Sequence, residues 1–131
     1  MRAVDTNMLV RALVQDDPAA ARRAQDLLLD HQVYVPVMVL LELEWVLRRR
    51  YGLAPAAITQ ALEKLAALEN VVVGVHAAVV AAAGKMAQGW DFADALHHAL
   101  SHGCADFVTL DAGLVKQARR INPLDPPVTR L

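Results

Sequence analysis

The chain has few cysteines, few aromatic residues and no large excess of either positive or negative charge. Cys104 is the only cysteine, so no disulfide can form within the chain, which suits a reducing compartment. We expect the Cys104 thiol to be buried in the fold. Aromatic residues make up 5% of the sequence, so the core must consist mainly of alanine, valine and leucine. Thirteen basic and fourteen acidic side chains give a net charge of -1, which by itself indicates neither a nucleic-acid-binding protein nor a protein that binds acidic ligands.

Long hydrophobic runs are also missing. The most apolar stretch, residues 71–84, is shorter than the roughly 18 residues that a membrane span needs. Asp5 interrupts the start of the chain, where a signal peptide would be apolar. We therefore expect a soluble, cytoplasmic protein. A length of 131 residues that are 56% hydrophobic fits one domain covering residues 1–131.

Short apolar runs alternate with longer helical patterns along the chain. The runs at 2–4, 33–36, 71–75 and 106–110 predict strands, and 126–131 predicts a short edge strand. Helices are expected over 7–15, 19–31, 38–52, 56–70, 76–89, 92–103 and 111–121. This order predicts an α/β fold, with one parallel sheet and helices on both of its faces.

Two aspartates follow predicted strands, at the sheet edge where α/β proteins bind ligands. Asp5 comes directly after the first strand and Asp111 after the fourth. Each also precedes a helix, so each has a plain alternative role as an N-terminal helix cap. Taken singly, the cap is the more common reason for such an aspartate.

Four more carboxylates lie at the starts or within the apolar faces of predicted helices. Glu42 and Glu44 interrupt the run VMVLLELEWVL, where a buried charge is costly unless it is paired or binds a metal. Glu44 could pair with Arg48, but the periodicity does not decide which glutamate faces a cavity. Asp91 and Asp94 open the helix at 92–103, and one of them can cap it.

Clustered carboxylates repel one another, and a bound hard cation relieves that repulsion. Ligand sets made only of oxygen suit Mg²⁺ or Mn²⁺ rather than Zn²⁺. Magnesium sites with few carboxylates usually also hold substrate phosphates. If the fold brings these acids together, the sequence thus favours metal-assisted chemistry on a phosphate ester.

The sequence resembles the PIN-domain ribonucleases, and among them the VapC-type toxins of bacterial toxin–antitoxin pairs. The resemblance runs in order through VDTNMLVR, VPVMVLLELEWVLRRRYGL, WDFADALHHAL and FVTLDAGL, and so covers nearly the whole chain. It implies a PIN-like fold, a three-layer α/β/α sandwich with a small parallel sheet. It also implies a Mg²⁺- or Mn²⁺-dependent endoribonuclease. It further implies a VapB-type antitoxin that blocks the enzyme, and a homodimer.

The resemblance also selects residues that the periodicity leaves open. It implies an acidic metal site made of Asp5, Glu42, Asp94 and Asp111. It leaves Glu44 as a flanking residue and implies supporting roles for Thr6, Asn7, Thr109 and Asp91. The sequence departs from the family after Asp111, where Ala112-Gly113-Leu114 replaces a charged residue followed by an aromatic one.

Other enzyme classes lack the residues that they need. A receiver domain needs a phospho-accepting aspartate after its third strand, and VVVGVH has none. A haloacid-dehalogenase-like phosphatase needs a second aspartate at position 7, and an amide cannot act as its general acid. Two alternatives remain: a non-catalytic RNA- or protein-binding domain of the same fold, and an RNA-processing nuclease without an antitoxin.

Several other side chains have simpler expected roles. His97 and His98 follow Asp94 on its face of the helix, where support or packing is expected rather than metal binding. Trp45 and Trp90 lie in apolar contexts that favour core or dimer packing over stacking on bases. Setting the four predicted ligands aside leaves ten acidic residues against thirteen basic ones, a mildly basic remainder that suits RNA.

Overall fold

A computed structural model describes residues 1–121 and 123–131 of the chain. In chain order the elements are β1 (Arg2–Ala3), α1 (Thr6–Val14), α2 (Pro18–Asp30), β2 (Val33–Val35), α3 (Val37–Arg49), α4 (Pro55–Ala66), β3 (Val71–Val73), α5 (His76–Ala87), α6 (Phe92–Leu100), β4 (Phe107–Thr109), α7 (Ala112–Ala118) and β5 (Val128–Arg130). The predicted α/β class is confirmed, and each predicted element is present with ends that differ by a few residues.

Local residue choices explain where helices begin and end. Asp17 caps α2 through a bond from the Ala20 amide, and Pro18 occupies the first turn, where a missing N–H has no cost. Gly52 follows α3 with a φ of +64°, a conformation that glycine adopts without steric cost. These residues end one element and start the next without help from distant parts of the chain.

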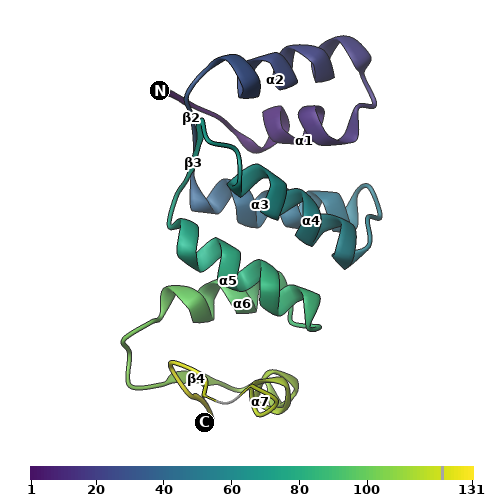
Figure 1. The fold of residues 1–131 in the computed structure, drawn as a ribbon. Helices are drawn as coiled ribbons and strands as arrows, with labels where there is room; N and C mark the ends of the chain where they lie inside the picture. Colours follow the sequence, from purple (N-terminus) through teal and green to yellow (C-terminus); the bar gives the residue numbers. More distant parts are fainter. Residues whose placement is uncertain (122) are drawn as a thin grey trace.

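The strands form two parallel sheets, where the sequence predicts one. In the first sheet β2 lies between β1 and β3, with Arg2 opposite Val33 and Val35 opposite Val73. In the second, β4 pairs with β5. The described strands β1 and β4 do not pair, and Figure 1 shows them near opposite ends of the molecule. Both residues of β1 are exposed, and the partly buried Phe107 of β4 packs against His98 rather than against the first sheet.

Aliphatic side chains from one face of the first sheet and from the helices fill the core, as the scarcity of aromatic residues predicts. Among the fully buried residues are Leu9, Leu43, Leu47, Ile58 and Phe92. Trp90 is buried too, in agreement with a packing role, whereas Trp45 is 55% exposed. Cys104 is exposed, so the expectation of a buried thiol is wrong, because it lies on the turn after α6 rather than on a packed face. Within the described residues, no helix is long and apolar enough to cross a membrane.

A buried histidine joins the C-terminal strands to the helices. His98 is fully buried on α6, and its ring packs against those of Trp90 and Phe107. Its Nε2 donates to the carbonyl oxygen of Pro126 at 2.7 Å, so its Nδ1 must accept the bond from Lys85 Nζ at 2.6 Å. The predicted packing role of His98 is therefore confirmed, and the ring links α5, α6 and the segment leading into β5.

This histidine should make the stability of the fold depend on pH. Burial, assisted by the Lys85 charge, lowers the pKa of His98 despite the bond to Pro126. The native chain then binds fewer protons than the unfolded chain, whose histidine titrates near about 6.5. The free energy of unfolding should thus fall as the pH drops below that value, until the lower native pKa is reached.

Urea unfolding of the parent chain at pH 7.5 and 5.5 measures this loss. His98→Gln should remove part of the difference between the two pH values, whereas the control His31→Gln, at an exposed histidine, should leave it unchanged. An identical pH difference in His98→Gln and the parent chain would contradict this assignment.

Candidate active site

The first carboxylate group, Asp5 and Glu42, lies where β1 and α1 meet α3. Asp5 caps α1, because its Oδ1 accepts from the Met8 amide at 2.9 Å. Thr6 is buried beside it and donates its hydroxyl to Glu42 Oε2 at 2.7 Å. Thr6 therefore positions Glu42 rather than Asp5, and Asn7 is exposed. Asp5 and Glu42 are both exposed, so their remaining oxygens can reach a ligand.

The second carboxylate group, Asp91, Asp94 and Asp111, lies between α6 and α7. All three side chains line one cavity of about 460 Å³. Asp91 caps α6 by accepting from the Asp94 amide at 3.2 Å, which leaves the Asp94 carboxylate free in the first turn. Asp111 caps α7 by accepting from the amides of Gly113 and Leu114.

The charges of this second group act on one another. Partial burial raises the pKa of Asp94, and the negative charges of Asp91 and Asp111 raise it further, while His97 opposes them. A carboxylate in this position gains stability when a cation neutralises its neighbours. The arrangement is therefore suited to a positively charged ligand.

Asp111 is held by its own turn. The Thr109 hydroxyl accepts a bond from the Asp111 amide at 3.0 Å, which fixes the backbone before the aspartate. Gly113 comes so close that a Cβ atom added there would lie 3.0 Å from Asp111 Oδ1. Gly113, which belongs to the Ala112-Gly113-Leu114 segment that departs from the family pattern, thus leaves room for the Asp111 carboxylate.

The structure does not assemble the four predicted ligands into one cluster. Asp5 follows β1 in the first sheet and Asp111 follows β4 in the second, so the division of the sheet separates them. Among the residues that the structure describes, no three His, Cys, Asp or Glu side chains come close enough to hold one metal ion. The four carboxylates lie in two groups, and their role as metal ligands stays a prediction.

Each group still has donors that suit a hard divalent cation. Mg²⁺ is usually bound through one or two carboxylates and keeps several waters. The donors in both groups are carboxylate oxygens, which Mg²⁺ and Mn²⁺ prefer. The pairs Asp5 with Glu42 and Asp94 with Asp111 therefore fit such an ion in chemical type, without a closed cage of protein ligands.

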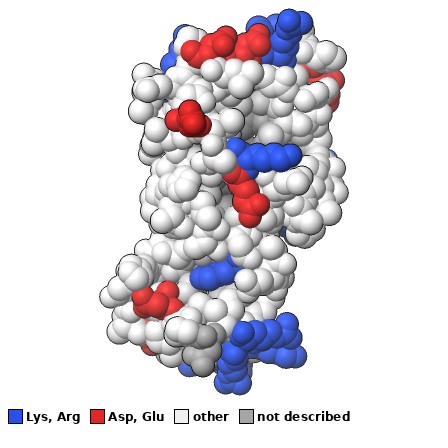
Figure 2. Space-filling view, in the orientation of Figure 1, with Lys and Arg blue, Asp and Glu red and all other residues white. Residues whose placement is uncertain are grey.

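Basic side chains lie next to the second group. Lys116 and Arg120 line the same cavity as the three aspartates. Figure 2 shows lysine and arginine atoms gathered at the end of the molecule where Figure 1 places α7. Lys116 belongs to α7, and Arg119 and Arg120 directly follow it. Cations beside carboxylates can hold a phosphate while the carboxylates hold a metal ion.

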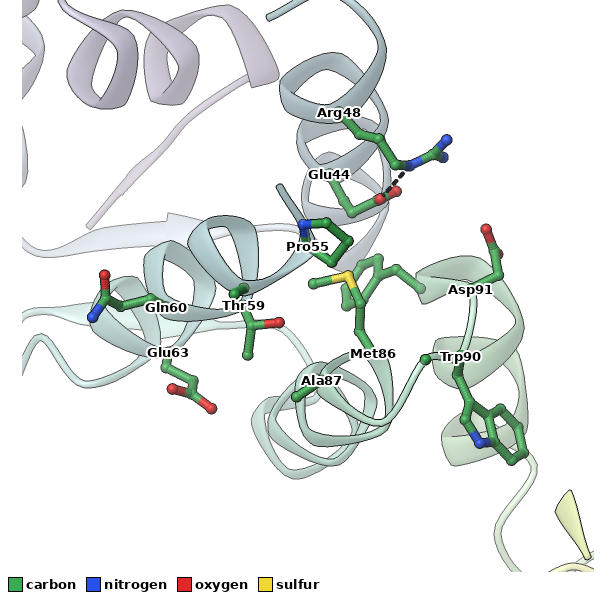
Figure 3. A pocket seen from close by; sticks show the side chains of 13 residues that line it. Glu44, Arg48, Pro55, Thr59, Gln60, Glu63, Met86, Ala87, Trp90 and Asp91 are labelled. Carbon is green, nitrogen blue, oxygen red and sulfur yellow. Dashed lines mark hydrogen bonds and ion pairs between the residues drawn. The ribbon is translucent and has the colours of Figure 1, made fainter. Parts of the chain in front are cut away.

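Glu44 is the buried carboxylate of α3, a point that sequence periodicity left open. The residue is 3% exposed, and Oε1 accepts from Arg48 Nε at 2.7 Å (Figure 3). The spacing of four residues on one helix was the available signal for this pair. The exposed Glu42 and the buried Glu44 thus face different surroundings, although both border one shallow cavity on α3.

The comparison with protein-family models identifies the class. The PIN domain model matches residues 2–120, so the chain belongs to the PIN domain family. PIN domains are generally nucleases and typically use divalent metal ions. No curated protein matches the sequence.

Proposed function

We propose that this PIN domain is a metal-dependent endoribonuclease and the toxin of a type II toxin–antitoxin pair. The observation that carries the proposal is the cavity in which Asp91, Asp94 and Asp111 lie beside Lys116 and Arg120. Carboxylates for a metal ion and cations for a phosphate then occupy one place. The helices α6 and α7 both begin at these aspartates. The positive ends of the two helix dipoles add to the attraction of the cavity for anions.

Asp5 with Glu42, and Asp94 with Asp111, are the residues that would hold Mg²⁺ or Mn²⁺. Such an ion supplies a water of lowered pKa as the nucleophile and stabilises negative charge on the phosphoryl oxygens. Hydrolysis would leave a 3′-hydroxyl and a 5′-phosphate. No histidine base is needed for this reaction, which agrees with the burial of His98 in a packing role.

The chain's own residues keep the carboxylates in place. Thr6 holds one oxygen of Glu42, and the amides of α1 and α7 hold one oxygen each of Asp5 and Asp111. Thr109 fixes the turn that carries Asp111, and Asp91 fixes the first turn of α6 below Asp94. Held side chains lose less conformational freedom when they bind an ion, and such supporting contacts commonly change activity 10- to 100-fold.

The partners follow from the same proposal. We place a VapB-type antitoxin on the exposed face of α3, where Met38 is 67% exposed and Trp45 borders the same cavity as Glu42. A protein docked there would cover Glu42. The resemblance to the toxins supports a cytoplasmic homodimer. An antitoxin gene beside this one, encoding a small DNA-binding protein, would distinguish the toxin from an RNA-processing nuclease.

Removing divalent metal tests the proposed activity. The chain, purified free of any inhibitor protein, should cut total RNA with Mg²⁺ or Mn²⁺ and stop cutting in EDTA. Adding excess Mn²⁺ to the chelated sample should restore cleavage. Cleavage that continues in EDTA would exclude the metal mechanism, and a chain that binds RNA without cutting it under any of these conditions would favour the non-catalytic alternative.

A further inference from the structure

A third cavity, of about 760 Å³, lies between α3, α4, α5 and the start of α6 (Figure 3). None of Asp5, Glu42, Asp94 and Asp111 lines it, so the proposed hydrolysis does not explain it. Its volume falls within the range of small-molecule sites. The cavity shares lining residues with the cavities beside both carboxylate groups. Glu44 and Arg48 also line the cavity that contains Glu42, and Asp91 also lines the cavity that contains Asp94.

The cavity is lined by an ion pair in which the Glu44 carboxylate is buried and the Arg48 side chain is 32% exposed. Glu44 is almost fully buried, yet the bond that accounts for its carboxylate is the one that Arg48 donates to Oε1. A carboxylate can accept about four hydrogen bonds, so Glu44 keeps acceptor capacity toward the cavity. Figure 3 shows the Arg48 guanidinium beside it, with nitrogen atoms directed away from the pair. Burying the Glu44 carboxylate is costly even beside a cation, and a fold that needed only stability could place an apolar residue here.

A second polar group in the cavity, the Thr59 hydroxyl, has no partner in the part of the chain that the structure describes. Thr59 of α4 is 7% exposed, and its Oγ1 is buried without a hydrogen-bond partner among the described residues. In Figure 3 this oxygen is turned toward the space between α4 and Met86. An unpaired buried hydroxyl costs about 1–3 kcal/mol, whereas valine would fill the same volume without that cost. The unpaired hydroxyl therefore points to a ligand independently of the ion pair.

The rest of the lining favours a flat, uncharged group. Pro55, Met86 and Phe92 supply apolar surface. Glu63 and Asp91 are exposed at the rim, so an anionic group would be repelled from the interior. A nucleobase has the required shape, because its faces are apolar and its edge carries hydrogen-bonding groups.

We propose that this cavity binds a guanine base of the RNA substrate, next to the phosphodiester that is cut. Guanine carries two adjacent donors, N1–H and N2–H₂, which match a carboxylate, and an acceptor, O6, which matches the neighbouring guanidinium. Adenine, cytosine and uracil do not present this pattern, because each has an acceptor where guanine has one of its donors. Glu44 and Arg48 are thus specificity-determining residues, and Thr59 adds a hydroxyl to the same site. The inference rests on the proposed ribonuclease function.

Nucleotide binding tests the site without requiring cleavage. Titration calorimetry of the full chain in EDTA should show that guanosine 5′-monophosphate binds at least about 10-fold more tightly than the adenosine, cytidine and uridine monophosphates. Glu44→Gln should weaken guanosine monophosphate binding about 10-fold, and the exposed control Glu69→Gln should leave it unchanged. Equal binding of the four nucleotides, or none, would overturn the proposal.

A second variant keeps the test informative if Glu44→Gln folds poorly. Thr59→Val should raise the melting temperature of the free chain, because it removes an unpaired buried hydroxyl, and should reduce the further rise that guanosine monophosphate causes. An unchanged rise in both variants would overturn the proposal. The proposal would also fail if the site bound a cationic ligand instead. An oligoarginine peptide tests this, and the contradicting result is binding that Glu44→Gln abolishes and guanosine monophosphate does not displace. Guanine binding without RNA cleavage would refute the nuclease alone, whereas metal-dependent cleavage without guanine binding would refute only this site.

Discussion

The Asp94→Asn variant is expected to cut RNA at least about 100-fold more slowly than the parent chain, because it removes a proposed direct metal ligand and not merely a support. Asparagine has nearly the shape of aspartate, and Asp94 makes no ion pair among the described residues, so the fold should survive the change. The charge at the centre of the second carboxylate group is nevertheless lost. Initial rates of cleavage of one labelled RNA in Mg²⁺ measure the effect.

The matched control is Asp26→Asn, which removes an exposed carboxylate of α2 outside both carboxylate groups. It should cut at the parent rate. Circular dichroism and melting temperatures of both variants show whether the fold is intact. Parent-like cleavage by a folded Asp94→Asn variant would remove Asp94 from the site.

His98→Ala is expected to lower the free energy of unfolding by about 3 kcal/mol, the usual cost of truncating a large buried side chain that also makes hydrogen bonds. The substitution leaves a cavity between Trp90 and Phe107 and removes the bonds to Lys85 and Pro126. For a chain of this size the melting temperature should fall by about 10 °C. Urea and thermal unfolding both measure the loss.

A smaller change separates hydrogen bonding from packing at the same place. Lys85→Met keeps an aliphatic side chain near Trp90 but removes the donor to His98 Nδ1, and should cost about 1 kcal/mol. The exposed control Lys64→Met should cost less than about 0.5 kcal/mol. A His98→Ala variant as stable as the parent chain would show that the ring does not hold the C-terminal strands.

Most of the elements could be predicted from the sequence because their signals are local. Asp17-Pro18 starts α2, and three consecutive valines from Val71 form β3. Asp5 and Asp111 illustrate the same point, since both caps follow from an aspartate placed just before a helix. A cap and a metal ligand do not exclude each other, because capping uses one carboxylate oxygen of the two.

The arrangement of those elements could not be predicted in the same way. Which strand pairs with which depends on contacts between distant residues, and nothing in RAV or DFVTL shows that β1 and β4 stay apart. The burial of Glu44 and the exposure of Cys104 depend likewise on how α4, α5 and the turn after α6 are placed. The sequence could indicate that α3 carries a carboxylate needing a partner, but not which of its two glutamates is covered.

The central claim is that both carboxylate groups, although the structure keeps them apart, are needed for the same phosphodiester cleavage. The most direct test measures the cleavage rate of a single labelled RNA by Asp5→Asn, Asp94→Asn and the double variant under identical Mg²⁺ concentrations. Residues that act as a unit give losses that do not multiply. We predict that each single variant loses at least about 100-fold and that the double variant is no slower than the slower single one. Parent-like rates in either single variant, or losses that multiply in the double variant, would contradict the claim.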